Sequence, residues 1–139
     1  MGTRAIVRLI ETLEHGTENN IVLYTQYDGN PEWYGKTLAE FAAKMTIVNG
    51  MGGDTTNIAN GAGCFAAQLV SHLKKGAGNI YLYASFDDVS WLDYTYDLII
   101  QEGKPVMIKV YAVEYGENKA SESLLFTGTC AEFLDSLKK

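Results

Sequence analysis

The chain has few of the residues from which small proteins build disulfide frameworks and catalytic centres. Of its 139 residues, only two are cysteine and two are histidine. Two cysteines cannot build a disulfide framework, and Cys64 and Cys130 lack the paired spacing of a metal site. On one helix, Cys64 and His72 would lie about 12 Å apart along the axis, too far for a nucleophile and its base. The sequence therefore favours a non-enzymatic role, and we expect neither a metal nor a cofactor.

Long apolar runs and a strong charge of either sign are also missing. No run approaches the roughly 20 apolar residues that cross a bilayer, and charged residues interrupt the first apolar stretch, so no secretory signal is predicted. The formal net charge of −6 argues against general nucleic-acid binding. We therefore expect one soluble domain, residues 1–139, in the cytoplasm and without a membrane partner.

Strand and helix patterns fill most of the chain. Alternating or β-branched segments predict strands, and amphipathic segments behind capping residues predict helices. The predicted strands are Ala5–Leu13 and residues 21–27, 80–85, 94–101, 106–115 and 123–126, with a brief extended piece at 46–48. The predicted helices begin at Asn30 or Thr37, at Cys64 and at Thr129. This order predicts an α+β fold, in which three helices mainly cover one face of an antiparallel sheet of about five to six strands.

Alternation along the first strand separates two kinds of side chain. The aliphatic residues at positions 5, 7 and 9 would face one side, and Arg4 and Arg8 the other. Tyr24 and Asp28 fall on the matching face of the second strand and its end. Guanidinium groups beside tyrosines can clamp an anionic or aromatic ligand. The alternative is a solvated sheet face on which arginine pairs with aspartate or glutamate.

Residues 49–63 contain five glycines and three asparagines, directly before the helix predicted at 64–75. Free backbone N–H groups and the helix dipole make a helix N-terminus a place where anions bind. We therefore predict a site for a small anionic ligand or a nucleotide there. Its predicted contacts are Asn60, Gly61, Gly63 and Cys64, joined by Arg4, Arg8, Tyr24 and Asp28. The alternative is an irregular loop that needs glycine for unusual backbone angles.

The first part of the chain contains a set of short motifs. They are Met1-Gly2-Thr3-Arg4, Tyr27-Asp28-Gly29 with Pro31 and Gly35, Asn49-Gly50, Asn60-Gly61-Ala62-Gly63-Cys64, Ala66-Ala67-Gln68-Leu69-Val70, Gly76-Ala77-Gly78 and Tyr81-Leu82-Tyr83. As a set they resemble a family of small uncharacterised proteins associated with bacteriophages, large DNA viruses and scattered microbial genomes. The resemblance covers residues 1–100 or so. It implies an accessory or counter-defence role in the host cytoplasm, such as sequestering a signalling nucleotide, and it brings no catalytic motif.

Two other functions stay open. Seven of the nine tyrosines can line a pocket or a subunit contact, and with the hairpin predicted at 94–115 the tyrosine content favours a protein-interaction or structural module. These seven are Tyr24, Tyr27, Tyr34, Tyr81, Tyr83, Tyr94 and Tyr96. Such a module would act as a homo-oligomer through its sheet. A small hydrolase or transferase would have to use Asp28 or Cys64.

Overall fold

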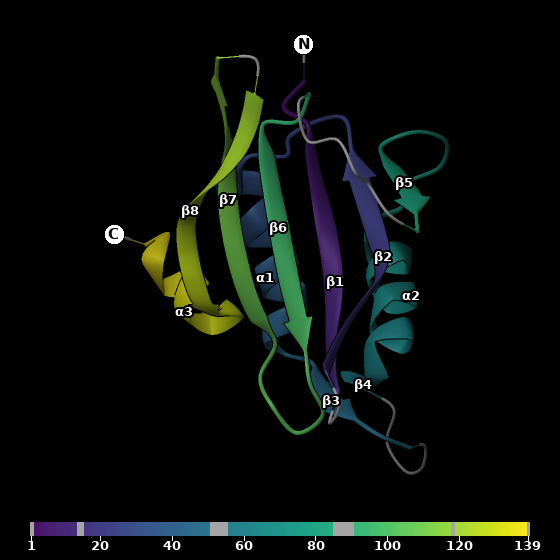
Figure 1. Cartoon of the computed structure of the whole chain (residues 1–139). Helices are drawn as coiled ribbons and strands as arrows, with labels where there is room; N and C mark the ends of the chain where they lie inside the picture. The colour runs from purple at the N-terminus through teal and green to yellow at the C-terminus, as the bar shows by residue number, and fades with distance from the viewer. Residues whose placement is uncertain (1, 14–15, 51–55, 85–90, 118, 139) are drawn as a thin grey trace.

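A computed structural model describes residues 2–13, 16–50, 56–84, 91–117 and 119–138. Six strands form one sheet in the order β5-β2-β1-β6-β7-β8 (Figure 1). They are β1 (Ala5–Leu13), β2 (Gly16–Thr25), β5 (Ile80–Tyr83), β6 (Tyr94–Ile100), β7 (Met107–Gly116) and β8 (Lys119–Thr129). Neighbouring strands are antiparallel, except that β1 and β6 run parallel. The α+β class is therefore confirmed, with one parallel pair in its centre.

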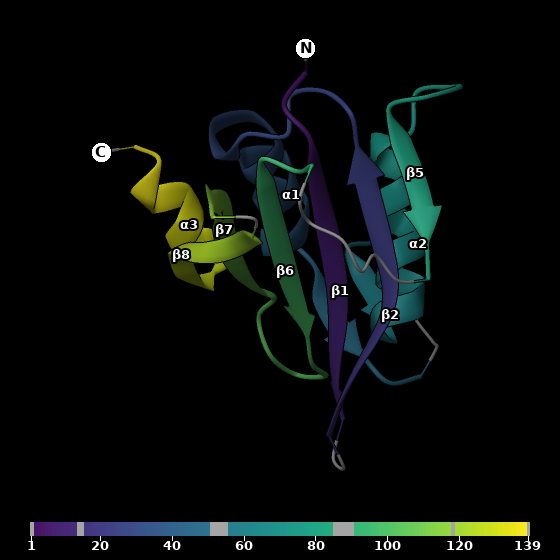
Figure 2. The ribbon, with the colours of Figure 1, turned by 45° about the horizontal axis from the view of Figure 1, so that its top comes forward.

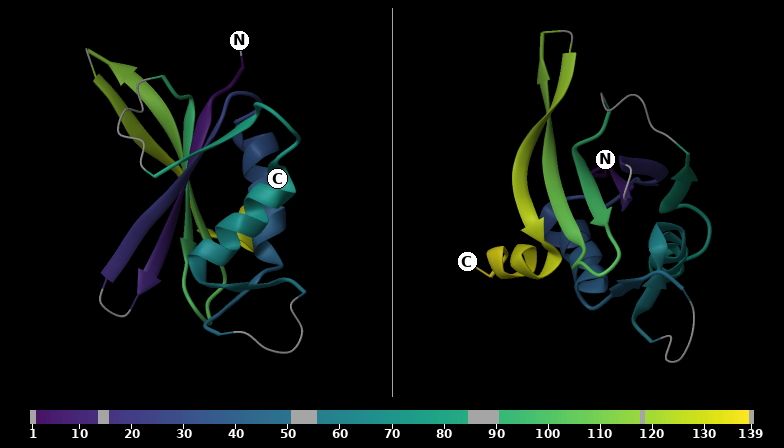
Figure 3. Two further views of the ribbon diagram at one scale, coloured as in Figure 1. Left: turned by 90° about the vertical axis from the view of Figure 1, so that its right-hand side faces the viewer. Right: turned by 60° about the horizontal axis from the view of Figure 1, so that its bottom comes forward.

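The three α-helices lie on one face of the sheet, as Figure 3 shows from the side. They are α1 (Lys36–Ala43), α2 (Gly61–Leu73) and α3 (Cys130–Ser136). The aliphatic side chains at positions 5, 7 and 9 of β1 are at most 1% exposed and belong to the core between sheet and helices. Leu38, Phe65 and Phe133 fill this core from the three helices in turn. Burial of these apolar groups holds the two layers together.

The opposite face of the sheet carries a smaller apolar cluster and a group of charged residues. Ile6, Val22 and Tyr24 pack there against Leu92 and Val113. Arg8 follows Ile6 on the same face, since alternate residues of a strand point to the same side. The predicted alternation along the first strand is therefore confirmed.

Both predicted starts of the first helix correspond to a boundary in the structure. A π-helical turn, Pro31–Gly35, follows Asn30, whose carbonyl accepts from the Tyr34 amide at 2.9 Å. Proline suits this first turn because its missing N–H would have had no partner there. The turn leads directly into α1, which begins at Lys36, one residue before the alternative start at Thr37. The capping box predicted at Thr37 is wrong, because the Thr37 hydroxyl donates to the carbonyl of Trp33 at 2.9 Å.

The other element boundaries agree with the predictions only in part. The capping box at the start of α3 is confirmed, since the Thr129 hydroxyl accepts from the Glu132 amide at 3.1 Å and the Glu132 carboxylate accepts from the Thr129 amide at 2.8 Å. In contrast, α2 begins three residues before the predicted Cys64. A second sheet pairs β3 (Thr46–Val48) with β4 (Ile58–Asn60), a strand that the sequence did not predict. β8 exceeds its predicted four residues because it pairs with β7 along its whole length.

Candidate functional site

The predicted site residues fall in three separate places. Asn60, Gly61, Gly63 and Cys64 lie at the N-terminus of α2, Arg8 and Tyr24 lie on the open face of the sheet, and Asp28 lies in the loop after β2. The N-terminus of α2 follows β4 at the bottom of Figure 1, whereas β2 ends and β1 begins at the top. The backbone amide of Arg4, at that upper end, donates to the Asp93 carboxylate at 2.9 Å. The structure therefore does not unite the predicted site.

The N-terminus of α2 already holds an anion that the protein itself provides. The Ala62 amide donates to the Glu11 carboxylate of β1 at 3.1 Å. Gly61 makes room for this approach, because a Cβ at its φ of +78° would lie 3.1 Å from the same carboxylate oxygen. The Asn60 side chain turns away from the helix and accepts from the Gly50 amide at 2.9 Å. The prediction of free donors is therefore wrong at Ala62, where the helix dipole stabilises Glu11 instead.

A cavity of about 640 Å³ lies beside this helix end, between β1, β3 and β4. Asn60 and Gly61 line it, and so do Glu11 and Glu102. Among the described lining residues, these two carboxylates carry the only formal charges. Two negatively charged residues in the lining of one cavity disfavour a phosphate or carboxylate ligand. The other two predicted residues at this helix end, Gly63 and Cys64, bring no positive charge. Gly63 borders open space, since a Cβ there would have no neighbour within 4 Å, and the Cys64 thiol lies 3.7 Å from the Gln68 amide oxygen.

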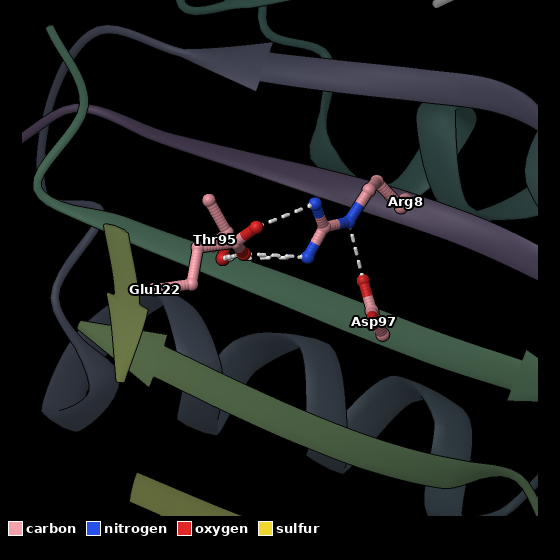
Figure 4. Close-up of polar contacts among 4 residues, drawn as sticks. All are labelled: Arg8, Thr95, Asp97 and Glu122. Carbon is pink, nitrogen blue, oxygen red and sulfur yellow. Dashed lines mark hydrogen bonds and ion pairs between the residues drawn. The ribbon is translucent and has the colours of Figure 1, made fainter. Parts of the chain in front are cut away.

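On the open face of the sheet, Arg8 is bound by the protein's own carboxylates (Figure 4). Its Nε donates to Asp97 at 2.6 Å, and its terminal nitrogens donate to both Glu122 oxygens at 2.7 and 3.1 Å. The Thr95 hydroxyl also donates to Glu122, and the guanidinium lies 5.7 Å from the centre of the Tyr111 ring. The alternative of an arginine paired with aspartate or glutamate therefore describes Arg8. A ligand would have to displace two carboxylates to reach it.

The pKa values in this cluster follow from burial and pairing. Burial opposes the charge of Arg8, but hydrogen bonds and attraction from Glu122 and Asp97 outweigh it and raise the arginine pKa above its ordinary value. Burial raises the pKa of Asp97, and Arg8 offsets only part of that shift. Burial also acts to raise the pKa of Glu122, yet hydrogen bonds from Arg8 and Thr95 bring it below its usual value. The cluster is thus a structural charge network that ties β1, β6 and β8 together.

A third place, around Asp28, differs from the other two. A cavity of about 400 Å³ lies where β2 ends and β5 begins, next to the last residue of α2. Figure 2 shows β5 beside β2, with α2 behind both. The polar and aromatic residues that line the cavity are Thr25, Tyr27, Asp28, Trp33, Tyr34, Thr37 and Asn79. We call it the Tyr34 cavity.

Two buried polar atoms of the Tyr34 cavity have no hydrogen-bond partner. They are the Tyr34 hydroxyl and the Asn79 Oδ1, and among the described residues they are the two side-chain atoms in this condition. Tyr34 is 7% exposed, and burial raises the pKa of its phenol, so the hydroxyl stays neutral. Each unpartnered buried group costs on the order of 1–3 kcal/mol of stability. A ligand or a water molecule that bonded to these two atoms would remove that cost.

The fold holds the loop that carries Asp28 firmly in place. The Tyr96 hydroxyl of β6 donates to the Gly29 carbonyl at 2.6 Å, and the Gly29 amide donates to the Thr3 carbonyl at 3.0 Å. Gly29 is required at this contact, because a Cβ there would lie 2.8 Å from the Cβ of Ala5. The Tyr34 ring packs edge-on against Tyr96, with 5.7 Å between the ring centres. Contacts with Tyr96 in the core of the sheet thus fix both the loop that carries Asp28 and the Tyr34 ring.

Backbone strain also gathers at the Tyr34 cavity. Three non-glycine residues in the described part of the chain have positive φ, and two of them, Asp28 at +55° and Asn79 at +52°, line this cavity. Aspartate and asparagine tolerate this conformation better than other residues, but it still carries a cost. The third such residue, Asn57, lies before β4. Strain at two lining residues is consistent with a binding site.

The sequence pointed to only part of this cavity. Asp28 was among the predicted ligand contacts, and Tyr27 and Tyr34 were among the seven tyrosines expected to line a pocket or a subunit contact. Trp33 and Asn79 were not predicted. Asn79 follows Gly76-Ala77-Gly78, a run typical of turns, and this pattern alone cannot identify a residue with an unpartnered side-chain oxygen.

Comparison of the chain with protein-family models, with curated proteins and with solved structures finds no match. Among the described residues, no three histidine, cysteine, aspartate or glutamate side chains are grouped so that they could hold a metal ion. Within the same part of the chain, none of the helices combines the length and the apolar character needed to cross a bilayer. The geometry of the cavities is therefore the basis for a functional proposal.

Proposed function

We propose that the protein is a non-enzymatic binding module for a small ligand, and that the ligand occupies the Tyr34 cavity. The observation that carries this proposal is that two residues lining one cavity, Tyr34 and Asn79, each have a buried side-chain polar atom without a hydrogen-bond partner. Its volume of about 400 Å³ lies within the range typical of small-molecule sites. Folding leaves both atoms without partners at a cost in stability, which a ligand that bonds to them would recover.

The lining residues favour binding over catalysis. Among those described, there is no histidine, cysteine or lysine, and Asp28 is the one carboxylate. Burial raises the pKa of the Tyr34 phenol, so the hydroxyl stays protonated and has no phenolate to act as a base. A hydrolase or transferase needs a nucleophile with an adjacent base, or an acid–base pair. The described walls of this cavity offer neither arrangement.

The proposal moves the ligand away from the N-terminus of α2. That helix end is engaged by Glu11, and its cavity is acidic, so an anion finds no advantage there. The resemblance to phage and viral proteins adds a biological role to the proposal: the protein would act as an accessory factor that sequesters a small signalling molecule. A nucleotide would then be held through its base rather than its phosphate.

Thermal unfolding with a chemically diverse panel tests the proposal. The panel includes nucleosides, amines, sugars and cyclic dinucleotides. A ligand at about 100 times its dissociation constant should stabilise the wild type by about 2.7 kcal/mol. The Tyr34→Phe variant should lose much of that gain, whereas Glu102→Gln, which changes the acidic cavity, should keep it. A panel without any shift, or a ligand bound equally well by Tyr34→Phe, would contradict the proposal.

A second candidate function is self-association through β8. This strand forms one edge of the sheet, and its Leu124 and Leu125 side chains are 52% and 55% exposed. Edge strands with exposed apolar residues are places where a second chain can pair. Light scattering after size exclusion should then report a dimer that Leu125→Lys converts to a monomer. A wild type that is monomeric at every concentration would rule this candidate out.

A further inference from the structure

Two residues of the Tyr34 cavity, Asn79 and Asp28, present side-chain oxygens that can only accept hydrogen bonds. The Asn79 side chain uses its Nδ2 to donate to the Leu73 carbonyl at 3.2 Å, at the C-terminal end of α2. Only its Oδ1, an acceptor, is left without a partner. Asp28 adds a carboxylate, which is acceptor-only when ionised. The unpartnered Oδ1 and the carboxylate are thus acceptors, although the Asn79 amide nitrogen keeps a second N–H.

The hydroxyl oxygens of the two threonines that line the cavity add further acceptors. The Thr25 hydroxyl donates to the Tyr27 carbonyl at 3.2 Å, and the Thr37 hydroxyl donates to the Trp33 carbonyl at 2.9 Å. Each hydroxyl has one proton, so both have spent their donor and keep only lone pairs. Among the described side chains that line the cavity, the donors that remain are the phenols of Tyr27 and Tyr34, the indole N–H of Trp33 and the second N–H of the Asn79 amide. The Asp28 carboxylate and the Asn79 Oδ1 can only accept, so a ligand that bonds to these two groups must bring N–H groups of its own.

Charge and shape narrow the ligand further. Asp28 is the one ionisable group with a formal charge among the described lining residues, and it is negative. Lys74, next to the lining residue Leu73, donates its ammonium to the carbonyls of Gly78 and Ile80 at 2.6 and 2.8 Å. A phosphate or carboxylate would therefore meet an acceptor-rich wall and a like charge. A neutral or cationic ligand avoids both penalties.

Two exposed aromatic side chains stand at the same cavity. Trp33 is 67% exposed and Tyr27 is 60% exposed, and both line it. Large exposed rings beside a cavity provide flat surfaces on which a planar ligand can stack, and they attract cations through their π faces. Stacking of a nucleic-acid base on an aromatic side chain contributes to affinity whichever base it is, because every base has a flat π face. Shape therefore favours a flat ligand.

We infer that the Tyr34 cavity binds an uncharged or cationic planar group with adjacent N–H donors, the amidine-type edge shared by guanine and by the guanidinium ion. The inference rests on the proposed binding function and names the ligand class of the same site. Neighbouring N–H groups match the two oxygens of the Asp28 carboxylate, the geometry that makes guanidinium–carboxylate pairs strong. Further N–H groups can meet Asn79 Oδ1, while Trp33 or Tyr27 covers the flat face.

Titrations monitored by nuclear magnetic resonance test this inference with four probes. Guanosine and methylguanidinium carry the N–H edge, and comparing the two shows whether the natural source is a base or a free guanidinium. Inosine is guanosine without the 2-amino group, and inorganic phosphate is the anionic control. We expect at least one of the first two to bind, guanosine about tenfold more tightly than inosine if it is the base, and phosphate to leave the resonances of the cavity unmoved.

Asp28→Asn is the decisive variant, because asparagine tolerates the same positive φ and keeps the backbone in place. It should weaken the binding of the N–H probes about tenfold, whereas Glu102→Gln in the acidic cavity should leave it unchanged. Equal affinity for guanosine and inosine with no binding of methylguanidinium, or phosphate bound in the cavity, would overturn the ligand class. If another panel compound then binds and Tyr34→Phe weakens it, the proposed function survives that failure. If nothing binds at Tyr34 and Asn79, both proposals fail.

Discussion

Tyr34 and Tyr96 form a natural matched pair for testing the Tyr34 cavity. Their rings are in edge contact, both are at most 7% exposed, and burial raises the pKa of both phenols. The Tyr96 hydroxyl donates to the buried Gly29 carbonyl at 2.6 Å, whereas the Tyr34 hydroxyl has no partner. The same change, tyrosine to phenylalanine, should therefore have opposite effects on the ligand-free protein at the two positions.

The magnitudes follow from the cost of burying polar groups. Tyr34→Phe removes an unpartnered hydroxyl and should raise the free energy of unfolding by about 1 kcal/mol, or the melting temperature by roughly 4 °C. Tyr96→Phe leaves the Gly29 carbonyl buried without its donor and should lower the free energy of unfolding by about 1–3 kcal/mol. Urea and thermal unfolding of the purified variants measure both changes.

The result that would refute this reasoning is a clear destabilisation by Tyr34→Phe, comparable to that by Tyr96→Phe. It would mean that the Tyr34 hydroxyl has a partner in the ligand-free protein, such as a tightly bound water. A stabilised variant that also loses ligand affinity would show the opposite. The hydroxyl would then be retained for binding at the expense of stability, a trade-off common at functional sites.

Three further substitutions test how the fold supports the sites, each by urea unfolding. Arg8→Met should lower the free energy of unfolding by about 3 kcal/mol at neutral pH, because Asp97 and Glu122 lose their cation. That loss should shrink as the pH falls, since burial raises the pKa of Asp97 and its protonation removes an uncompensated charge; a pH-independent loss would contradict this account. Gly29→Ala should cost about 1–3 kcal/mol through its clash with Ala5, and a variant as stable as the wild type would argue against that contact. Thr129→Ala should cost about 0.5–2 kcal/mol by removing the cap of α3, and an unchanged midpoint would show that the cap is dispensable.

The fold class could be predicted because it depends on local patterns. Alternation identified Ala5–Leu13 with the observed bounds of β1, and the capping box identified the start of α3 at Thr129. The parallel pairing of β1 with β6 could not be predicted in this way, since it joins strands about 90 residues apart through tertiary packing. β4 has only three residues, too few for a periodic pattern, and depends on its pairing with β3.

The site was harder to predict because it depends on which polar atoms remain unpaired after folding. The sequence predicted free donors for an anionic ligand at the N-terminus of α2, but it could not show that Glu11, 51 residues away, would bond to the Ala62 amide there. Likewise, Asn79 is unremarkable in sequence. It matters because its amide nitrogen caps the end of α2 while its buried oxygen has no partner, in a residue that lines the same cavity as Trp33 and Tyr34.

The electrostatics of the described residues are the reason for proposing a ligand other than an anion. Two of the positive features that suggested an anion are paired within the protein: Arg8 with Asp97 and Glu122, and the positive end of α2 with Glu11. With a net charge of −6, the chain has carboxylates to spare, and one of the remainder, Asp28, lines the Tyr34 cavity. The charged group and the unpartnered amide oxygen of this cavity are acceptors, so in the proposed site selectivity comes from the donors that the ligand carries. The deficit of cations that disfavours phosphate is thus the reason for proposing an N–H-rich partner, and the exposed rings of Trp33 and Tyr27 are the reason for proposing a planar one.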